Sequence, residues 1–457
     1  MNPHIFREYD IRGVVGKDLN DDSVELLGRA FGTMLRQSGR MACTLGRDCR
    51  KSSWGFAMAM AKGMTDCGID VLDCGTIPTP MAYWSMFLLP VDACVMVTGS
   101  HNPKEFNGFK LCMNRTPIFG AQLQELRRMA EAGDFVHGSG SVTPVNVVPS
   151  YMEKVFLSAR MGRRRLRVVV DAGNGTGGVV AVPLLERLGV EVIPLFCNMD
   201  GDFPNHHPDP TVPENLEALK EEVVSRKADL GIAFDGDADR LGIVTEKGEA
   251  IFGDMILLIL ARAVLKEVPG AEIVSEVKCS QVLFDEVARL GGRPVMWRVG
   301  HSLIKAKMAE DDAALGGEMS GHIFFRHRWY GFDDAIYSAT RFLEILSAHD
   351  GPASSLLDGV PRRFSTPEIR VDCPDDMKFK LVEVASKTFR TMGLAVVDVD
   401  GARVQFPAGW GLVRASNTQP VLVLRFEAES PDDLKTIQTE VFKVVEQARA
   451  SLAGGES

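Results

Sequence analysis

The chain has 457 residues, of which 45% are hydrophobic and 25% are charged, as in an ordinary water-soluble globular protein. Because one hydrophobic core does not extend over this length, we expect two to four domains. Acidic residues exceed basic residues by 61 to 51, and the resulting net charge of −10 argues against non-specific nucleic-acid binding and against adhesion to anionic membranes.

The start of the chain has no apolar leader of the kind found in signal peptides. Residues 6–13, FREYDIRG, combine dense charge with two aromatic rings and are interpreted as a solvated N-terminal arm. The most apolar run, residues 255–261, is too short to cross a bilayer and predicts a buried helix. The nine cysteines form no CxxC pair and several lie in apolar runs, which favours buried free thiols in a reducing cytoplasm.

Residues 23–132 alternate between helical and strand patterns. Alternation at this spacing predicts parallel βαβ units with right-handed crossovers. A segment rich in Gly, Ser and Pro, residues 133–149, predicts the first domain boundary. Helices are expected at 23–37, 54–67, 81–88 and 120–132, and strands at 41–45, 69–73, 93–97 and 107–111.

A polar turn, TGSHNP at residues 98–103, follows the apolar strand 93–97. Gly99 allows the backbone to turn sharply, and Pro103 prevents an ordinary strand from continuing. Ser100 would lie at the carboxyl end of a parallel strand, where open α/β sheets place reactive groups. Taken alone, the segment is more typical of an ordinary turn than of a site, because Ser and Asn are common turn residues.

A second α/β unit is expected from strands at 166–170, 190–195 and 229–234 and a helix at 214–226. A glycine cluster follows its first strand, at residues 173–178. The cluster matches neither a dinucleotide-binding nor a P-loop spacing, so it predicts a tight strand-to-helix turn in preference to a nucleotide loop.

Three carboxylates follow the strand 229–234. Asp235, Asp237 and Asp239 converge on one side of a turn, where they repel one another unless a cation neutralises them. Oxygen ligands of this kind suit Mg²⁺ or Ca²⁺, and the loop lacks the glycine and glutamate of an EF-hand. The alternative is a solvated acidic turn, but the position at the end of a buried strand favours a ligand site.

A third unit is expected to begin near Ile251. After one of its strands comes the loop 315–322, LGGEMSGH. If this backbone is extended, Glu318, Ser320 and His322 face the same side; the alternative is ordinary hydrogen bonding at the surface. The expected helices are 254–266 and 280–290, and the expected strands are 272–277 and 294–298.

A boundary near residues 358–366 separates a last unit of α+β character. Its loop 414–420, RASNTQP, supplies a guanidinium fork, hydroxyls and backbone N–H groups, which together predict a phosphate cradle. The expected elements are strands at 368–371, 411–413 and 421–427, helices at 376–392 and 431–452, and a hairpin across 399–402.

Six motifs in this order carry a resemblance to a known family: residues 6–13, 98–103, 107–110, 235–240, 317–322 and 414–418. Over essentially its whole length the chain resembles the α-D-phosphohexomutase family, and within it the bacterial phosphomannomutase/phosphoglucomutase group. The resemblance implies an α/β fold in which three similar mixed α/β domains and a C-terminal α+β domain surround a central cleft. The expected domains are 1–147, 148–250, 251–361 and 362–457.

The resemblance also implies an activity: interconversion of hexose 1-phosphate and hexose 6-phosphate, with mannose or glucose as the sugar. The reaction would pass through a phosphoserine at Ser100 and a hexose 1,6-bisphosphate intermediate, which also serves as activator. One Mg²⁺ would be held by Ser100, Asp235, Asp237 and Asp239. The expected protein is a cytoplasmic monomer or weak homo-oligomer that binds hexose phosphates but neither nucleic acid nor membrane.

The same likeness assigns roles to further residues. Either Lys110 or His301 could move the sugar proton. The residues expected at the site of transfer are Arg12, His101, Lys110, Arg240 and His301, with Lys278 nearby. Those expected to bind the substrate are Tyr9, Lys278, Glu318, Ser320 and His322, and those expected to hold its remote phosphate are Arg414, Ser416, Asn417 and Thr418.

Three other functions compete with this interpretation. A phosphoglucosamine mutase typically has Gln after the loop glutamate and a Ser-Gly-Thr phosphate loop, whereas this chain has Met319 and the sequence SNT at 416–418. A metal-dependent phosphatase with an aspartyl nucleophile would use Asp235 and Asp237 and would remain active after Ser100→Ala. A catalytically inactive sugar-phosphate binding protein is disfavoured because Ser100, the three aspartates and Arg414 are all present.

Overall fold

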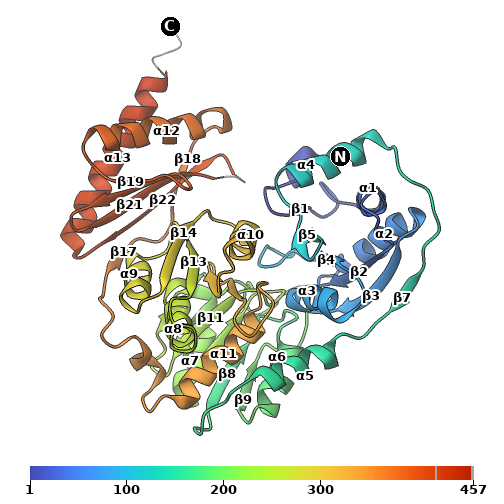
Figure 1. The fold of residues 1–457 in the computed structure, drawn as a ribbon, viewed down its shortest axis with the longest axis horizontal. Helices are drawn as coiled ribbons and strands as arrows, with labels where there is room; N and C mark the ends of the chain where they lie inside the picture. Colours follow the sequence, from blue (N-terminus) through green and yellow to red (C-terminus); the bar gives the residue numbers. More distant parts are fainter. Residues whose placement is uncertain (417–418, 454–457) are drawn as a thin grey trace.

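A computed structural model describes residues 1–416 and 419–453 of the chain. These residues form four sheets in chain order, each from a separate stretch of sequence. Figure 1 shows the four units along an arc, with the N-terminal and C-terminal units at its two ends. This arrangement confirms the predicted fold of three α/β units followed by one α+β unit.

The first unit has the sheet order β1-β5-β4-β2-β3-β7, with β6 paired to β5. Strands β4, β2, β3 and β7 are parallel, whereas β5 runs antiparallel to β4 and to β1. The elements are η1 (Pro3–Ile5), β1 (Ile11–Val14), α1 (Asp21–Gln37), β2 (Ala42–Arg47), α2 (Ser53–Asp66), β3 (Asp70–Thr76), α3 (Thr79–Leu88), β4 (Ala93–Val97), β5 (Phe106–Met113), β6 (Thr116–Pro117), α4 (Ala121–Ala132) and β7 (Val142–Pro144).

The interpretation of residues 6–13 as a solvated arm is wrong. Phe6 and Ile11 are buried in the core of the first unit, and β1 forms an edge strand of its sheet. Gly108 makes this pairing possible, because a Cβ there would meet the Ile11 carbonyl oxygen at 2.1 Å. The segment looked polar because residues 7–9 are partly exposed outside any strand and because alternate residues of β1 face the core.

The second unit has the order β12-β11-β10-β8-β9, in which β11 is antiparallel to β10. The acidic residues 235–240 therefore form the connection of a hairpin. Ile251, expected at the start of the third unit, is the last residue of β12 in this sheet. The elements are α5 (Val148–Ser158), β8 (Arg167–Asp171), α6 (Gly178–Arg187), β9 (Glu191–Leu195), η2 (Pro213–Leu216), α7 (Glu217–Ser225), β10 (Leu230–Phe234), β11 (Leu241–Thr245) and β12 (Ala250–Ile251).

The glycine cluster after β8 is a strand-to-helix turn, as predicted, and it packs against the acidic hairpin. The Thr176 N–H donates to the Gly236 carbonyl at 3.0 Å. A Cβ on Gly175 would meet that carbonyl oxygen at 2.5 Å. The Gly236 backbone thus fills the space beside Gly175 that a nucleotide phosphate would need.

The third unit has the order β14-β13-β15-β16. The apolar run 255–261 lies in α8, and the side chains of residues 256–261 are buried, as expected for a core helix. Helices α10 and α11 had no counterpart among the expected elements. The elements are α8 (Gly253–Glu267), β13 (Glu272–Glu276), α9 (Gln281–Arg289), β14 (Arg293–Trp297), α10 (His301–Asp311), β15 (Leu315–Gly317), β16 (Ile323–Phe325), α11 (Ala335–Ala348) and η3 (Ala353–Leu357).

The fourth unit is an antiparallel sheet with the order β17-β22-β21-β20-β19, and β18 pairs separately with β22. Helices α12 and α13 pack on it and enclose its own apolar core. The elements are β17 (Phe364–Ser365), β18 (Ile369–Asp372), α12 (Asp375–Thr391), β19 (Val396–Val397), β20 (Ala402–Phe406), β21 (Gly409–Ala415), β22 (Val421–Ala428) and α13 (Pro431–Ala453).

The four units are joined in two different ways. One hydrophobic core runs through the first three, and Trp329 of the third unit stacks on Trp84 of the first, with ring centroids 6.0 Å apart. The fourth unit is attached by buried arginines and by a small apolar cluster of Val277, Trp410 and Leu412. Arg403 donates to the carbonyls of Val277 and Cys279 at 2.6 and 2.8 Å, and its guanidinium lies 3.8 Å from the centroid of Trp410.

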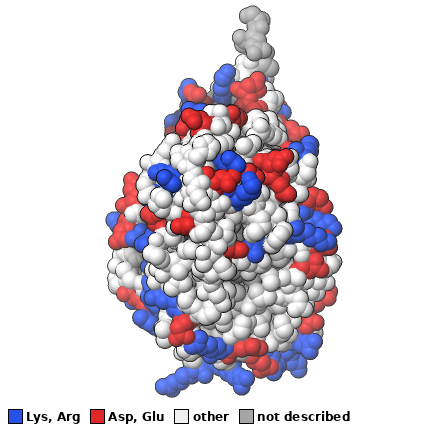
Figure 2. Space-filling model, turned by 90° about the vertical axis from the view of Figure 1, so that its right-hand side faces the viewer, with Lys and Arg blue, Asp and Glu red and all other residues white. Residues whose placement is uncertain are grey.

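All nine cysteines are free, and seven of them are buried. None of the helices in the described part of the chain combines the length and the apolar character needed to cross a membrane. Figure 2 shows that the face on the first unit's side carries both signs of charge side by side around a largely uncharged centre. This face therefore has no single-sign surface of the kind that attracts polyanions.

Candidate functional site

The three aspartates after β10 lie at the centre of the site. Asp235, Asp237 and Asp239 are fully buried, and one oxygen of each lies within 4.8 Å of the others. Burial and then the two neighbouring carboxylates raise the pKa of Asp235 well above its usual value. Oδ1 of Asp237 is buried without a hydrogen-bond partner among the described residues. Buried carboxylates this close require a cation.

Two cations from other units already face these carboxylates. Lys110 Nζ on β5 lies 2.9 Å from Asp237 and also pairs with Asp239. Although burial lowers the pKa of Lys110, the two carboxylates outweigh burial and raise it. His322 Nε2 lies 3.2 Å from Asp239, and although burial lowers its pKa, this carboxylate helps to raise it to about 9.

Ser100 is aimed at the same carboxylates. Its hydroxyl donates to Asp235 Oδ2 at 2.8 Å and lies 3.1 Å from His101 Nδ1. Ser100 has φ +49°, in the left-handed region that non-glycine residues seldom adopt. A Cβ on Gly236 would meet the Ser100 carbonyl oxygen at 2.6 Å, so the hairpin approaches the serine turn as closely as a glycine allows.

An ion pair that sequence reasoning missed holds the serine turn. Asp48 Oδ2 accepts from Thr98 Oγ1 and from the Gly99 N–H, at 2.9 and 3.0 Å. Arg50, also buried, lies 3.1 Å from that oxygen and donates to backbone carbonyls at positions 100, 102, 103 and 106. The sequence could have indicated this ion pair, because polar residues come directly after the strand 41–45. That strand, β2, is parallel to β4, so both strands end at the same edge of the sheet.

A cavity of about 500 Å³ lies beside these groups and is lined by residues of all four units. Arg12 and Lys110 come from the first unit, Arg240 from the second, and Lys278 from the third, so the wall is rich in cations. The predicted site residues that line it are Tyr9, Arg12, His101, Lys110, Arg240, Lys278, His301, Glu318, Ser320 and His322.

Residues 315–317 form strand β15, but residues 318–322 are a tight turn and not extended, because the Glu318 N–H donates to the His322 carbonyl at 2.9 Å. The three side chains expected on one side still meet. His322 Nδ1 lies 2.8 Å from Glu318 Oε2 and 3.2 Å from Ser320 Oγ. Glu318 Oε1 accepts from the Gly300 N–H at 2.8 Å. A carboxylate has about four acceptor positions, so Glu318 retains acceptors for a ligand hydroxyl.

His301 is the first residue of α10. Both ring nitrogens are buried without a well-aligned hydrogen bond to a described residue, and Nδ1 lies 3.3 Å from Asp333 Oδ2. Burial and then the charge of Lys305 lower the pKa of His301 below its usual value. The imidazole is therefore neutral near pH 7.

Tyr9 comes from the first unit and contacts the same segment. Its hydroxyl donates to the Val299 carbonyl at 2.5 Å. Gly300 has φ +133°, and a Cβ there would lie 2.4 Å from Cζ of the Tyr9 ring. Glycine at this position therefore allows the first and third units to meet at the cavity.

The fourth unit contributes residues that were not expected. Arg370 and Gln419 line the cavity, and Arg370 Nη1 donates to Gln419 Oε1 at 3.1 Å. Arg414, at the end of β21, donates to Asp400 Oδ2 at 2.8 Å and is not among the lining residues. Ser416 follows β21 and receives a hydrogen bond from the Gln419 N–H at 3.2 Å. Asn417 and Thr418 lie outside the described residues.

Family comparisons cover the four units in order. The chain matches the alpha/beta/alpha domain models I, II and III of phosphoglucomutase/phosphomannomutase over residues 3–137, 149–248 and 252–364. It matches the C-terminal domain model of the same family over residues 368–444.

Individual proteins agree with these matches. The chain is 46% identical to a phosphomannomutase/phosphoglucomutase of Pseudomonas aeruginosa, covering 95% of this chain and 94% of the relative. It is 43% identical to a phosphoglucomutase of Neisseria gonorrhoeae, covering 97% and 96%. A crystal structure of a phosphoglucomutase/phosphomannomutase family protein from Burkholderia thailandensis superimposes with a TM-score of 0.93, at 43% identity, covering 98% of each chain.

The first prediction concerns the buried ion pair of Asp48 and Arg50, which binds the backbone of the serine turn. Arg50→Met leaves Asp48 as an uncompensated buried charge and frees four carbonyls, so the free energy of unfolding should fall by about 3 kcal/mol. Urea unfolding followed by circular dichroism measures this change. Arg128→Met is the control, because the Arg128 side chain is 65% exposed; an equal loss in both variants would contradict the assignment.

Proposed function

Because the chain belongs to the phosphoglucomutase/phosphomannomutase family, we propose that it interconverts hexose 1-phosphates and hexose 6-phosphates, with glucose and mannose as the sugars. The observation that supports this most directly is the Ser100 hydroxyl, 2.8 Å from a buried carboxylate and beside a cation-rich cavity. A cavity of about 500 Å³ falls in the range of small-molecule sites. Its cationic wall suits an anionic substrate.

Ser100 is the proposed phosphate carrier. In the first half-reaction a sugar hydroxyl oxygen attacks the phosphorus of the phosphoserine, and the bond from phosphorus to Ser100 Oγ breaks. The proton of the attacking hydroxyl passes to a base, and the product is a hexose 1,6-bisphosphate. The bisphosphate then turns over, and Ser100 Oγ attacks the phosphorus of its other phosphate. The bond from that phosphorus to the sugar oxygen breaks, the sugar oxygen takes the proton back from the base, and the enzyme ends each cycle phosphorylated.

The residues around Ser100 suit phosphoryl transfer, which depends on positioning and on charge stabilisation. Arg12, Lys110 and Arg240 supply positive charge beside the reacting group, and His101 lies next to the serine. Glu318, Ser320 and His322 form a polar turn for the sugar hydroxyls. Lys278, Arg370 and Gln419, with Arg414 and Ser416 behind them, are the proposed binding residues for the phosphate that does not react.

Magnesium fits the acidic centre. Three fully buried carboxylates within 4.8 Å, one with an orphaned oxygen, form a hard-oxygen donor set of the kind that Mg²⁺ prefers. Asp235, Asp237 and Asp239 would hold the ion, with Ser100 or its phosphate beside it. When bound, the ion neutralises the phosphoryl oxygens.

His301 is the proposed proton acceptor. It is buried, neutral near pH 7, and its Nε2 lacks a partner among the described residues, whereas Lys110 is occupied by two carboxylates. Asp333 beside Nδ1 favours the tautomer in which Nδ1 carries the proton and Nε2 can accept one.

The phosphoglucosamine mutase alternative lacks support in the loop 315–322, where Met319 follows Glu318. The domain boundaries at 147/148, 250/251 and 361/362 stay predictions, as do the cytoplasmic location, the oligomeric state, and the absence of nucleic-acid and membrane partners. The free, mostly buried thiols support a reducing compartment.

Removal of the serine hydroxyl distinguishes the proposed mutase activity from the alternative of a phosphatase with an aspartyl nucleophile. In Ser100→Ala, intact mass spectrometry should show loss of the one-phosphate increment present in the wild type. Turnover of glucose 1-phosphate and mannose 1-phosphate, assayed with catalytic hexose bisphosphate, should fall at least about 1,000-fold, because no residue can carry the phosphate. Ser451→Ala, on the exposed side of α13, is the control; wild-type turnover by Ser100→Ala would support an aspartyl nucleophile.

Metal removal tests the acidic centre. A chelator should abolish mutase turnover, and added Mg²⁺ should restore it. Calorimetric titration with Mg²⁺ alone should show binding that Asp237→Asn weakens at least about tenfold, since one of three charged oxygen ligands is lost. Asp285→Asn, an exposed carboxylate on α9, should bind Mg²⁺ as the wild type does. Unchanged binding in Asp237→Asn would remove this residue from the site.

The pH dependence tests His301. Because its pKa is lowered from 6.5, the imidazole gains a proton only as the pH falls below that value, and kcat/KM should decline there. His301→Gln should lower kcat by about 100-fold or more and remove this acid limb. His327→Gln is the control, since the pKa of His327 is also lowered but its side chain lies outside the cavity. An acid limb that persists in His301→Gln would point to another base.

A further inference from the structure

A second cavity, of about 660 Å³, lies between the first and third units and is larger than the catalytic cavity. It is lined by α3, the β5–β6 turn, α10 and the loop 326–332, and no step of the proposed reaction uses it. Helix α10 separates the two cavities, because His301 lines the catalytic cavity while Ser302 and Lys305 line the second. We refer to this space as the α10 cavity.

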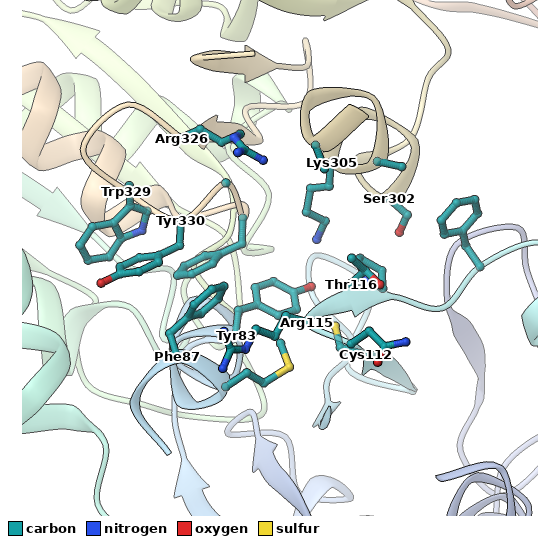
Figure 3. A pocket seen from close by; sticks show the side chains of 18 of the residues that line it. Tyr83, Phe87, Cys112, Arg115, Thr116, Ser302, Lys305, Arg326, Trp329 and Tyr330 are labelled. Carbon is teal, nitrogen blue, oxygen red and sulfur yellow. The ribbon is translucent and has the colours of Figure 1, made fainter. Parts of the chain in front are cut away.

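One side of the α10 cavity is aromatic. Phe87 and Tyr330 lie with ring centroids 4.6 Å apart, and Trp329 lies 5.4 Å from Tyr330. Figure 3 shows these three rings together on one side of the cavity, with Tyr83 near its centre. Trp329 is itself stacked on Trp84 and on Tyr337 and supports the wall from behind, so Phe87 and Tyr330 are the rings that a planar ligand would contact.

The charges of the α10 cavity have one sign. Arg115, Lys305 and Arg326 line it, and no Asp or Glu is found among the described residues that do so, in a chain of net charge −10. Lys305 pairs with Asp333 and Arg326 with Asp312, each at 2.7 Å. Arg115 forms no ion pair with any described residue, and its guanidinium lies 5.1 Å from the centroid of Phe87.

Ser302 adds an independent observation. Its side chain is fully buried, and its hydroxyl has no hydrogen-bond partner among the described residues. In Figure 3 this hydroxyl points into the cavity, near the Lys305 ammonium and across from the aromatic side. A buried hydroxyl without a partner is unfavourable, and an acceptor oxygen on a ligand would satisfy it.

We propose that the α10 cavity binds a small aromatic anion. The ring would pack against Phe87 and Tyr330. The anionic group would accept hydrogen bonds from Ser302 and Lys305 and lie within the field of Arg115. A nucleoside phosphate and an aromatic carboxylate share this chemistry, and the volume accommodates either.

Calorimetric titration of the full-length protein tests the proposal without relying on mutase activity. Uridine 5′-diphosphate and 4-hydroxybenzoate are the two probes, each titrated in the presence of excess glucose 1-phosphate to occupy the catalytic cavity. Saturable one-to-one binding of either probe is expected, and the tighter one identifies the anionic group. Uridine, which lacks the charge, and pyrophosphate, which lacks the ring, should bind at least about tenfold more weakly. Failure of both probes, or binding that glucose 1-phosphate abolishes, would overturn the proposal.

Variants locate the bound probe. Arg115→Glu should weaken binding at least about tenfold, because it replaces the unpaired cation with an anion, and its exposed position leaves the fold intact. Phe87→Ala should weaken binding by removing a stacking face. Arg226→Glu reverses an equal charge away from the cavity, because Arg226 directly follows α7 of the second unit and its side chain is 60% exposed, and this variant should bind as the wild type does. Equal affinity in Arg115→Glu, Phe87→Ala and the wild type would overturn the assignment.

Discussion

Three buried carboxylates within 4.8 Å impose the main constraint on this molecule. Asp235, Asp237 and Asp239 come from one hairpin of the second unit, and like charges in a low dielectric destabilise the folded state unless cations surround them. The chain supplies Lys110 from the first unit and His322 from the third. The site can therefore exist only where three units meet, which couples the assembly of the fold to the chemistry of the cavity.

The way the units are joined suits this requirement. The first three share one apolar core, which keeps the serine turn, the acidic hairpin and the loop 315–322 in fixed positions relative to one another. The fourth unit is attached by Arg403 and Arg425, which donate to backbone carbonyls after β13, and by a small cluster around Trp410. This attachment combines arginine–carbonyl hydrogen bonds with a small apolar cluster, and Arg414 pairs with Asp400 on the same unit.

Local patterns predicted most of the elements because helices and strands follow the period of their own residues. The strand before Ser100, the core helix α8 and the hairpin of the fourth unit are confirmed. The prediction for residues 6–13 was wrong because Phe6 and Ile11 reach the core while the polar residues between them stay partly exposed, mostly outside a strand. The expectation of an extended backbone was wrong for residues 318–322, because the hydrogen bond from the Glu318 N–H to the His322 carbonyl closes a turn that residue types do not specify.

The sequence by itself determined the order of the motifs, the fold class and the family, because periodicity and motif spacing are properties of neighbouring residues. Tertiary structure alone decided which side chains meet. It paired Lys110 with two of the aspartates and brought Asp48 and Arg50 into contact with the serine turn. It also brought His301 next to Asp333. It also brought Arg370 and Gln419 to the cavity in front of Arg414. These contacts mostly join residues far apart in the chain, and they follow from how sheets and helices pack, which no local pattern encodes.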